Sequence, residues 1–198
     1  PHATFVGHAD GGLVCWATAV LHSRVVTGIA LISSPHPAAL RTAVGHHDQG
    51  RALLPSLLSY QLPLWPEYAL TRHNAQALED LVRSRASAEW AAGEDFSEAM
   101  SYLRQAIQIP SAAHSALEYQ RWAVRSQLRG EGRRFMKLMN RRLDIPLLHL
   151  RGHGDPYVLA DAVERSRRYA PRGRFVEVPG AGHYAHEEAP ERVNDELQ

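Results

Sequence analysis

The chain has 198 residues, of which 44% are hydrophobic and 22% are charged, and its formal net charge is +1. This balance is typical of a folded domain and excludes a chain that is disordered throughout. The small net charge gives no overall attraction to nucleic acid or membranes, and no apolar run is long enough to span a bilayer. Cys15 is the only cysteine, which excludes a disulfide within the chain and favours a reducing compartment, so we expect a cytoplasmic protein.

The first 33 residues predict a strand, a helix and a second strand. Residues 3–7 form a short apolar run that ends in glycine, and residues 11–22 are mostly small or apolar. A helix that is apolar on all sides is normally buried, so we expect this one in the core. Residues 25–33 are β-branched and almost continuously apolar, which is typical of a parallel strand covered on both faces. Together these segments indicate a right-handed βαβ unit.

Helical patterns then replace this alternation for about 110 residues. The sequence predicts helices, interrupted by prolines, at 37–44, 50–60, 75–85, 95–108, 112–128 and 131–141. Strand signals return after Asp144, and the remaining elements are a strand at 145–151, a helix at 161–170, a strand at 174–180 and a last helix with Pro190 in its first turn.

This order of elements predicts an α/β fold with a mostly parallel sheet. The core is expected to consist of residues 1–35 and 145–198, and residues 36–144 are expected to form an inserted helical lid.

A glycine-rich segment follows the first strand and consists of Gly7, His8, Ala9, Asp10, Gly11 and Gly12. A strand, a tight turn and a helix are the outline of a nucleophile elbow, which needs small residues two positions before and two after its apex. Gly7 and Gly11 meet this need if Ala9 is the apex. If Asp10 were the apex, the bulky His8 would crowd the turn. The spacing therefore predicts Ala9 at the apex; a plain strand-to-helix turn without chemistry is the alternative.

Two further candidates lie just beyond later strands. Asp155 follows the strand at 145–151, and His183 follows the strand at 174–180 through a loop of small residues. The carboxyl ends of parallel strands are where α/β sheets build their sites. The order of elbow, acid and histidine is that of hydrolase triads. An Asp before a proline is also common in ordinary turns, so the order of all three carries the prediction.

A metal site is not expected. His46, His47 and Asp48 are adjacent in sequence, but neighbouring histidines rarely converge on one ion, and no third ligand site is evident. We therefore expect neither a metal nor another cofactor.

Several segments resemble the epoxide hydrolase-like branch of the α/β-hydrolase superfamily, and the likeness covers nearly the whole chain. They are FVGHADGGLVCWATAVLHSRVVTGIALISSPHP, SYQLPLWPEYAL, LEYQRWAVRS, LHLRGHGDPYV and VPGAGHYAHEEAPERV. Within this branch the chain is similar to the mycobacterial EphE-type group. The family has some hundred residues and four more strands before its elbow, so the resemblance implies a C-terminal portion with the N-terminal strands absent.

The resemblance also implies a reaction. In the family, an Asp at the elbow apex attacks an epoxide carbon and forms an ester, two lid tyrosines hold the epoxide oxygen, and a His activates water. Asp155, His183 and Tyr119 match the acid, the base and one tyrosine. The apex holds Ala9, so Asp10 is the candidate nucleophile. The other tyrosine position falls near Ser56, and Tyr60 lies one helical turn later.

Three alternatives remain open. A dehalogenase uses the same acid, base and nucleophile set with halide donors such as tryptophan, but Trp16 is expected to pack in the core. An esterase needs a serine at the apex, where none lies. A catalytically impaired hydrolase-fold protein would only bind a small apolar ligand under the lid, and Ala9 favours that reading.

The expected partner is a small apolar substrate, an epoxide or a lipid-like molecule, with no nucleic acid and no membrane span. Apolar lid residues support this expectation: Tyr60, Leu62, Leu64, Trp65 and Tyr68. Four strands would leave one side of the sheet uncovered, so a second copy of the chain or a missing N-terminal segment is the other expected partner.

Overall fold

The computed structural model describes residues 2–198, apart from the side chain of His47. Its centre is a parallel sheet with the strand order β1-β2-β3-β4. The strands are β1 (Ala3–His8), β2 (Val26–Ile32), β3 (Leu147–Gly152) and β4 (Arg174–Val178). All three neighbouring pairs run parallel, and β1 and β4 form the two edges. The predicted α/β class and parallel sheet are confirmed.

Helices connect and cover the strands. Those that match predicted segments are α1 (Asp10–Leu21), α2 (Pro37–Val44), α3 (His47–Ser59), α5 (Gln76–Arg83), α7 (Glu94–Ile107), α8 (Ala112–Ser126), α9 (Gly130–Met139), α10 (Ala160–Ser166) and α12 (Pro190–Leu197). The predicted helix at 161–170 covers α10 and the short 3₁₀ helix η2 (Arg167–Tyr169) that follows it. The sequence did not predict the short elements α4 (Trp65–Thr71), η1 (His73–Ala75), α6 (Ala88–Ala91) and α11 (Ala185–Glu188). One or two turns are too short to show a helical period.

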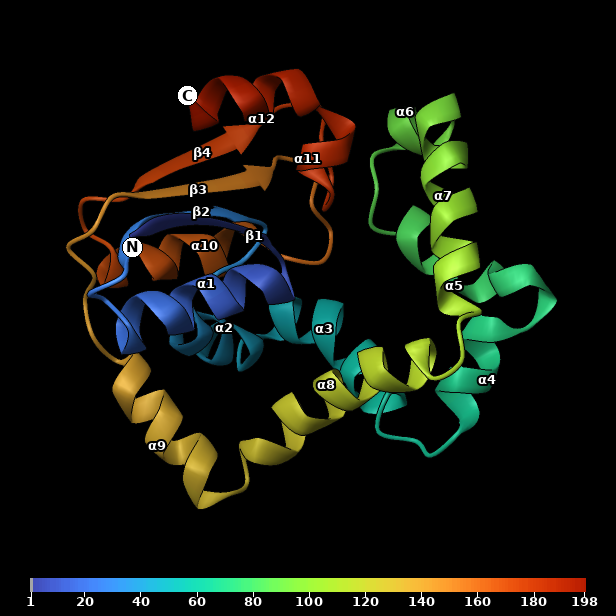
Figure 1. Cartoon of the computed structure of the whole chain (residues 1–198), viewed down its shortest axis with the longest axis horizontal. Helices are drawn as coiled ribbons and strands as arrows, with labels where there is room; N and C mark the ends of the chain where they lie inside the picture. Colours follow the sequence, from blue (N-terminus) through green and yellow to red (C-terminus); the bar gives the residue numbers. More distant parts are fainter. Residues whose placement is uncertain (1) are drawn as a thin grey trace.

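The two faces of the sheet are covered by different helices. In Figure 1, α1, α2 and α10 lie below the sheet, and α12 lies above it. Ile29 and Leu31 of β2 pack with Trp16 of α1 in one buried cluster, while Ile32 belongs to a second cluster with Val193 of α12. Since successive strand residues point to opposite faces, one apolar strand supplies both clusters. This explains the continuous apolar run of β2, which is buried as predicted.

The expectation that the first helix is buried on all sides is wrong. Cys15, Trp16 and Ala19 of α1 are buried, but Val14 is 54% exposed and Leu21 45% exposed. The reason is that β1 is an edge strand, so α1 packs on β1 and β2 with one face only. No described residue covers the other face. Val6 of β1 is 56% exposed at the same edge.

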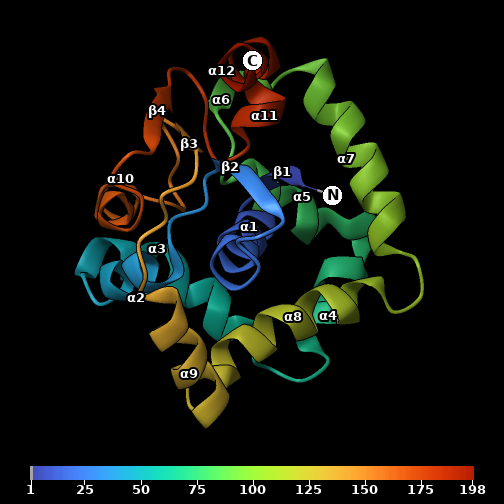
Figure 2. The same ribbon diagram turned by 60° about the vertical axis from the view of Figure 1, so that its left-hand side comes forward.

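The segment between β2 and β3 consists of helices and turns. Figures 1 and 2 show α4, α5, α6 and α7 beyond the carboxyl ends of the strands, with α8 running back toward α9. α2 packs against α10, next to the sheet. The division into a core and a lid at residues 36–144 stays a prediction. Within residues 2–198, no helix is both long and apolar enough to cross a membrane.

Candidate functional site

Ala9 alone separates the end of β1 from the start of α1. Its backbone has φ 47° and ψ −113°, a region that residues with a side chain seldom adopt. The Ala9 N–H donates to the carbonyl of Ile32 at 2.9 Å, and the Ser34 hydroxyl donates to the Ala9 carbonyl at 2.8 Å. These bonds hold the strained turn against the end of β2. Ala9 is therefore the tip of the turn, and Asp10 is the first residue of α1.

Close approach of strand and helix explains two of the glycines. A Cβ on Gly7 would lie 2.5 Å from the carbonyl carbon of Gly11, and a Cβ on Gly12 would lie 2.3 Å from the Cβ of Ser34. A Cβ on Gly11 would meet nothing within 4 Å. The expectation that Gly11 itself must lack a side chain is therefore wrong. Gly7 approaches the backbone of Gly11, whereas Gly12 is the residue of α1 that has no room for a side chain.

Asp155 and His183 meet at the carboxyl end of the sheet. The Nδ1 of His183 lies 2.9 Å from Oδ2 of Asp155, and each residue is only 2% exposed. Oδ1 of Asp155 accepts the N–H groups of Tyr157 at 2.8 Å and Val158 at 2.9 Å. Burial by itself would raise the pKa of Asp155, but the His183 bond and charge and the two N–H donors outweigh it and lower this pKa.

The pair has a defined proton arrangement. A carboxylate can only accept, so Nδ1 of His183 carries the proton that it donates to Asp155. The other ring nitrogen, Nε2, is then left with a free lone pair, which is what a general base needs.

His183 is held from three sides. Its N–H donates to the carbonyl of Arg85 at 2.9 Å, and its carbonyl lies 3.0 Å from Nε2 of His8. Burial, followed by the charges of His183 and His186, lowers the pKa of His8 to about 3, so this ring is neutral and its N–H faces the carbonyl. The carboxylate of Glu188 accepts three backbone hydrogen bonds of 2.7 to 2.9 Å, from the N–H groups of Gly182, Ser87 and Tyr184.

The sequence reading missed Arg85 and Glu188. The segment 85–87 between α5 and α6 bonds directly to the loop that carries His183. No local pattern marks Arg85. Glu188 lies just before Ala189 and Pro190, but nothing in the neighbouring sequence indicates that it accepts three hydrogen bonds.

The carboxylate of Asp10 faces α8 and the His183 loop. Its Oδ2 accepts a hydrogen bond from the Gln120 side chain. Burial raises the pKa of Asp10, while the positive charge of Arg85, the charge that His183 carries when it is protonated, and the Gln120 bond oppose this rise. The Arg85 guanidinium lies 3.6 Å from the ring centroid of Tyr157, whose ring in turn lies 5.1 Å from that of His183. Asp10 therefore lies within electrostatic reach of Arg85 and of His183.

Tyr119 lies beside Gln120 on α8 and is 42% exposed. Burial and the negative charge of Asp10 raise the pKa of Tyr119, so its hydroxyl keeps its proton and can donate. Tyr60 directly follows α3, and it contributes to the raised pKa of Tyr157 and of Tyr184. Ser56 lies one turn earlier, and its carbonyl accepts the N–H of Tyr60.

A buried arginine on α8 holds the loop that follows α3. Arg121 is 3% exposed and binds both carboxylate oxygens of Glu67, at 2.6 and 3.0 Å. It also donates to the carbonyls of Tyr60 at 2.7 Å and Leu62 at 2.8 Å. The Arg121 hydrogen bond lowers the pKa of Glu67 to about 2 against the opposing effect of burial. The sequence reading did not find this pair.

Two other expectations concern residues outside this cluster. Trp16 is fully buried and donates from Nε1 to the carbonyl of Ser34 at 3.0 Å, so it packs in the core as predicted. Of the residues His46, His47 and Asp48, the side chain of His47 lies outside the described part of the chain. Among the described side chains, no group of three or more His, Cys, Asp or Glu could hold a metal ion.

Known proteins resemble the chain along its whole length. A family model described as the alpha/beta hydrolase family matches residues 1–196. The chain is 28% identical to epoxide hydrolase 3 of Xenopus tropicalis over 197 residues, covering 96% of this chain and 50% of that protein. It is 24% identical to epoxide hydrolase 2 of Caenorhabditis elegans over 195 residues, covering 96% of this chain and 52% of that protein. The chain thus spans about half the length of the curated relatives it matches.

A solved structure shares the fold. The structure of an epoxide hydrolase from Bacillus megaterium in complex with an inhibitor matches with a TM-score of 0.75 at 20% identity, covering 99% of this chain and 68% of the other. The parallel sheet, the strained turn between β1 and α1 and the match to the family model lead to one conclusion. The chain belongs to the alpha/beta hydrolase family, and the curated relatives that it resembles are epoxide hydrolases.

Proposed function

We propose that this chain acts in the hydrolysis of apolar epoxides to diols, with the carboxylate of Asp10 as the nucleophile. The observation that carries the proposal is that Asp10, although one residue beyond the tip of the turn, accepts a hydrogen bond from Gln120, the neighbour of Tyr119 on α8, and lies within electrostatic reach of His183 and Arg85. A triad of Asp10, Asp155 and His183 follows from this assignment.

In the first step, a carboxylate oxygen of Asp10 attacks an epoxide carbon. An ester bond forms, the carbon–oxygen bond of the strained ring breaks, and the oxygen takes up the hydroxyl proton of Tyr119. The raised pKa of Tyr119 means that the proton is present to be given. The raised pKa of Asp10 works against the attack, because only the carboxylate is nucleophilic. The positive charge of Arg85 opposes this rise in pKa and so favours the carboxylate.

In the second step, water hydrolyses the ester. Nε2 of His183 takes a proton from water as the water oxygen attacks the ester carbonyl carbon of Asp10. The bond between this carbon and the ester oxygen then breaks, and the diol oxygen leaves with the proton that His183 holds. Asp10 keeps the water oxygen in its new carboxyl group, and the proton of that group returns to the Tyr119 phenolate. Asp155 holds His183 with Nε2 free and stabilises the imidazolium that forms, since the two side chains bond at 2.9 Å away from solvent.

The substrate class follows from the lid. Four large apolar or aromatic side chains of the loop and helix after Tyr60 are exposed, and Arg121 holds that loop in place. They are Leu62, Leu64, Trp65 and Tyr68. These side chains support an apolar epoxide, of aryl or lipid-like type. The buried, free thiol of Cys15 supports a reducing, cytoplasmic location.

A second candidate function is ligand binding without chemistry. Ala9 favours it, because the tip of the turn is where a nucleophile is expected to be mounted and a methyl group cannot attack carbon. In this case the lid would hold an apolar ligand, and His183 would have no ester to hydrolyse.

Mass spectrometry separates the two candidates. Styrene oxide in excess is incubated with the wild type and with the His183→Gln variant, which lacks the base of the second step. We expect diol from the wild type and an ester on Asp10 in the variant. Asp10→Asn should abolish both products, whereas the control Asp161→Asn, an exposed acid paired with Arg165, should leave both unchanged.

Two outcomes would decide against Asp10. Diol formation that survives Asp10→Asn would exclude it as the nucleophile. Styrene oxide bound without adduct or diol would support the binding protein, and Ala9→Asp would then be expected to create activity.

A further inference from the structure

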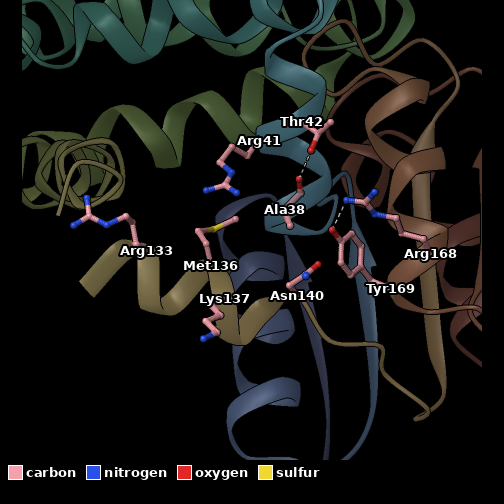
Figure 3. A pocket seen from close by; sticks show the side chains of 9 residues that line it. All are labelled: Ala38, Arg41, Thr42, Arg133, Met136, Lys137, Asn140, Arg168 and Tyr169. Carbon is pink, nitrogen blue, oxygen red and sulfur yellow. Dashed lines mark hydrogen bonds between the residues drawn. The ribbon is translucent and has the colours of Figure 1, made fainter. Parts of the chain in front are cut away.

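A cavity of about 390 Å³ lies between α2, α9 and η2 (Figure 3). Its lining residues are Ala38, Arg41 and Thr42 of α2, Arg133, Met136 and Lys137 of α9, Asn140 just after α9, and Arg168 and Tyr169 of η2. None of these residues belongs to the cluster around His183. The cavity is therefore a separate feature of the molecule, large enough for a small molecule.

The lining carries four positive charges and no carboxylate. The cations are Arg41, Arg133, Lys137 and Arg168. Within the described part of the chain, none of the four forms an ion pair with an acidic side chain. The neighbouring Arg165 and Arg167 differ, since they pair with Asp161 and Glu164 at 2.6 Å. Unpaired like charges around one cavity repel each other, and an anion between them would remove that repulsion.

The floor of the cavity is apolar and uncharged. Ala38, Met136 and Tyr169 are buried there, and the ring of Tyr169 stacks on His36 at 3.7 Å. Burial lowers the pKa of His36 to about 3, so it adds no charge. Figure 3 shows the Arg41 guanidinium above Met136 and the Arg168 guanidinium reaching in from the opposite side, beside Tyr169. In the same figure, the side chains of Arg133 and Lys137 extend outward from α9, so the cations lie at the rim of an open cavity.

We propose that this cavity binds a compact polyanion that carries at least two phosphate groups. Planar guanidinium groups suit phosphate oxygens because they donate two parallel hydrogen bonds, and Lys137 adds a mobile point charge. Asn140 supplies an uncharged amide donor at the rim. Four cations around one site favour a multivalent anion over a single carboxylate, whose charge would leave most of them uncompensated.

Lys137 makes the proposal testable, because it is the only lysine of the chain. An amine-reactive acylating reagent therefore reports on this cavity through one modified peptide, measured by mass spectrometry. We expect sodium tripolyphosphate to slow the acylation of Lys137 saturably, and sodium chloride at matched ionic strength not to do so. The readout does not depend on epoxide hydrolysis, so this proposal and the proposed function can fail separately.

A variant and a matched control test the assignment to this cavity. Arg41→Gln combined with Arg133→Gln removes two lining cations, and we expect about tenfold weaker protection or more, because each charge-assisted contact contributes on the order of a tenfold factor. Arg24→Gln combined with Arg172→Gln removes two exposed cations elsewhere and should leave protection unchanged. Circular dichroism establishes that both variants are folded.

Three results would overturn the proposal: no protection by tripolyphosphate, equal protection by sodium chloride, or unchanged protection in the Arg41 and Arg133 variant. A last arm identifies the source of the phosphates. Phosphatidylcholine vesicles with and without phosphatidylinositol bisphosphate are compared with tripolyphosphate. Protection by the phosphoinositide vesicles, together with weak protection by tripolyphosphate, would indicate a lipid headgroup; protection by tripolyphosphate alone would indicate a soluble ligand.

Discussion

Arg121 offers the sharpest test of how the loop between α3 and α4 is held. The Arg121→Met variant keeps a long side chain but removes five donors from a buried position. Glu67 then loses its bidentate partner, and the carbonyls of Tyr60 and Leu62 lose their donors. Breaking a buried ion pair by removing one partner costs about 3–5 kcal/mol, because the other charge stays behind uncompensated.

The pKa of Glu67 gives an independent magnitude. It falls from the usual 4.5 to about 2 in the folded chain, and each tenfold change in proton affinity corresponds to about 1.4 kcal/mol. The difference amounts to about 3 kcal/mol, which is an upper value because the side chain of Glu67 is 15% exposed and water screens the pair. We therefore expect Arg121→Met to lower the free energy of unfolding by about 2–3 kcal/mol at pH 7.

The sign of the pH dependence follows from the lowered pKa. The contribution of Glu67 is fully present above pH 4.5 and is lost as the pH falls toward 2. Urea unfolding between pH 7 and pH 2.5 should show this loss in the wild type and much less of it in Arg121→Met. A double-mutant cycle with Glu67→Gln isolates the pair. A coupling below about 0.5 kcal/mol, or an unchanged acid dependence in the variant, would refute the reasoning.

Two further predictions concern the elbow and the acid. Gly12→Ala should lower the free energy of unfolding by about 1–3 kcal/mol, because its Cβ would overlap the buried side chain of Ser34. Gly11→Ala has open space at its Cβ and should be neutral or stabilising by up to about 1 kcal/mol. Equal effects of the two substitutions in thermal melts would contradict the close approach of Gly12 to Ser34. Asp155→Asn should lower the free energy of unfolding by about 1.5–3 kcal/mol at pH 7, because the charge-assisted hydrogen bonds to the carboxylate are lost. Because the pKa of Asp155 is lowered, its contribution to the free energy of unfolding is present above about pH 3.8 and is lost below it. The free energy of unfolding of the variant should therefore fall less steeply with acid than that of the wild type. An unchanged acid dependence would show that His183 does not stabilise the carboxylate.

Much of the fold could be predicted from local patterns. Continuous apolar runs located the strands, and helical periodicity located most helices to within a few residues. The spacing of Gly7 before Ala9 indicated the tip of the turn, because only small residues allow a strand and a helix to approach so closely. The order of Asp155 and His183 indicated that they meet, since both follow parallel strands whose carboxyl ends share one edge.

The contacts that define the candidate site depend on the tertiary structure. Asp10 and Gln120 are 110 residues apart, and Arg121 and Glu67 are 54 apart. No local period relates such positions, so their pairing is decided only when α8 packs against α3 and α4 and Gln120 reaches the start of α1. The same holds for Glu188, whose three bonds join the His183 loop to the segment between α5 and α6 at Ser87.

The sequence alone determined the class of fold, the position of the strained turn and the order of acid and base, because each rests on a short stretch or on chain order. Only the tertiary structure decided which face of α1 is covered, that Asp10 faces Gln120 and the His183 loop, and that four unpaired cations of α2, α9 and η2 surround one cavity. These features arise where helices distant in the chain pack together, and burial and charge there depend on neighbours that local sequence does not specify.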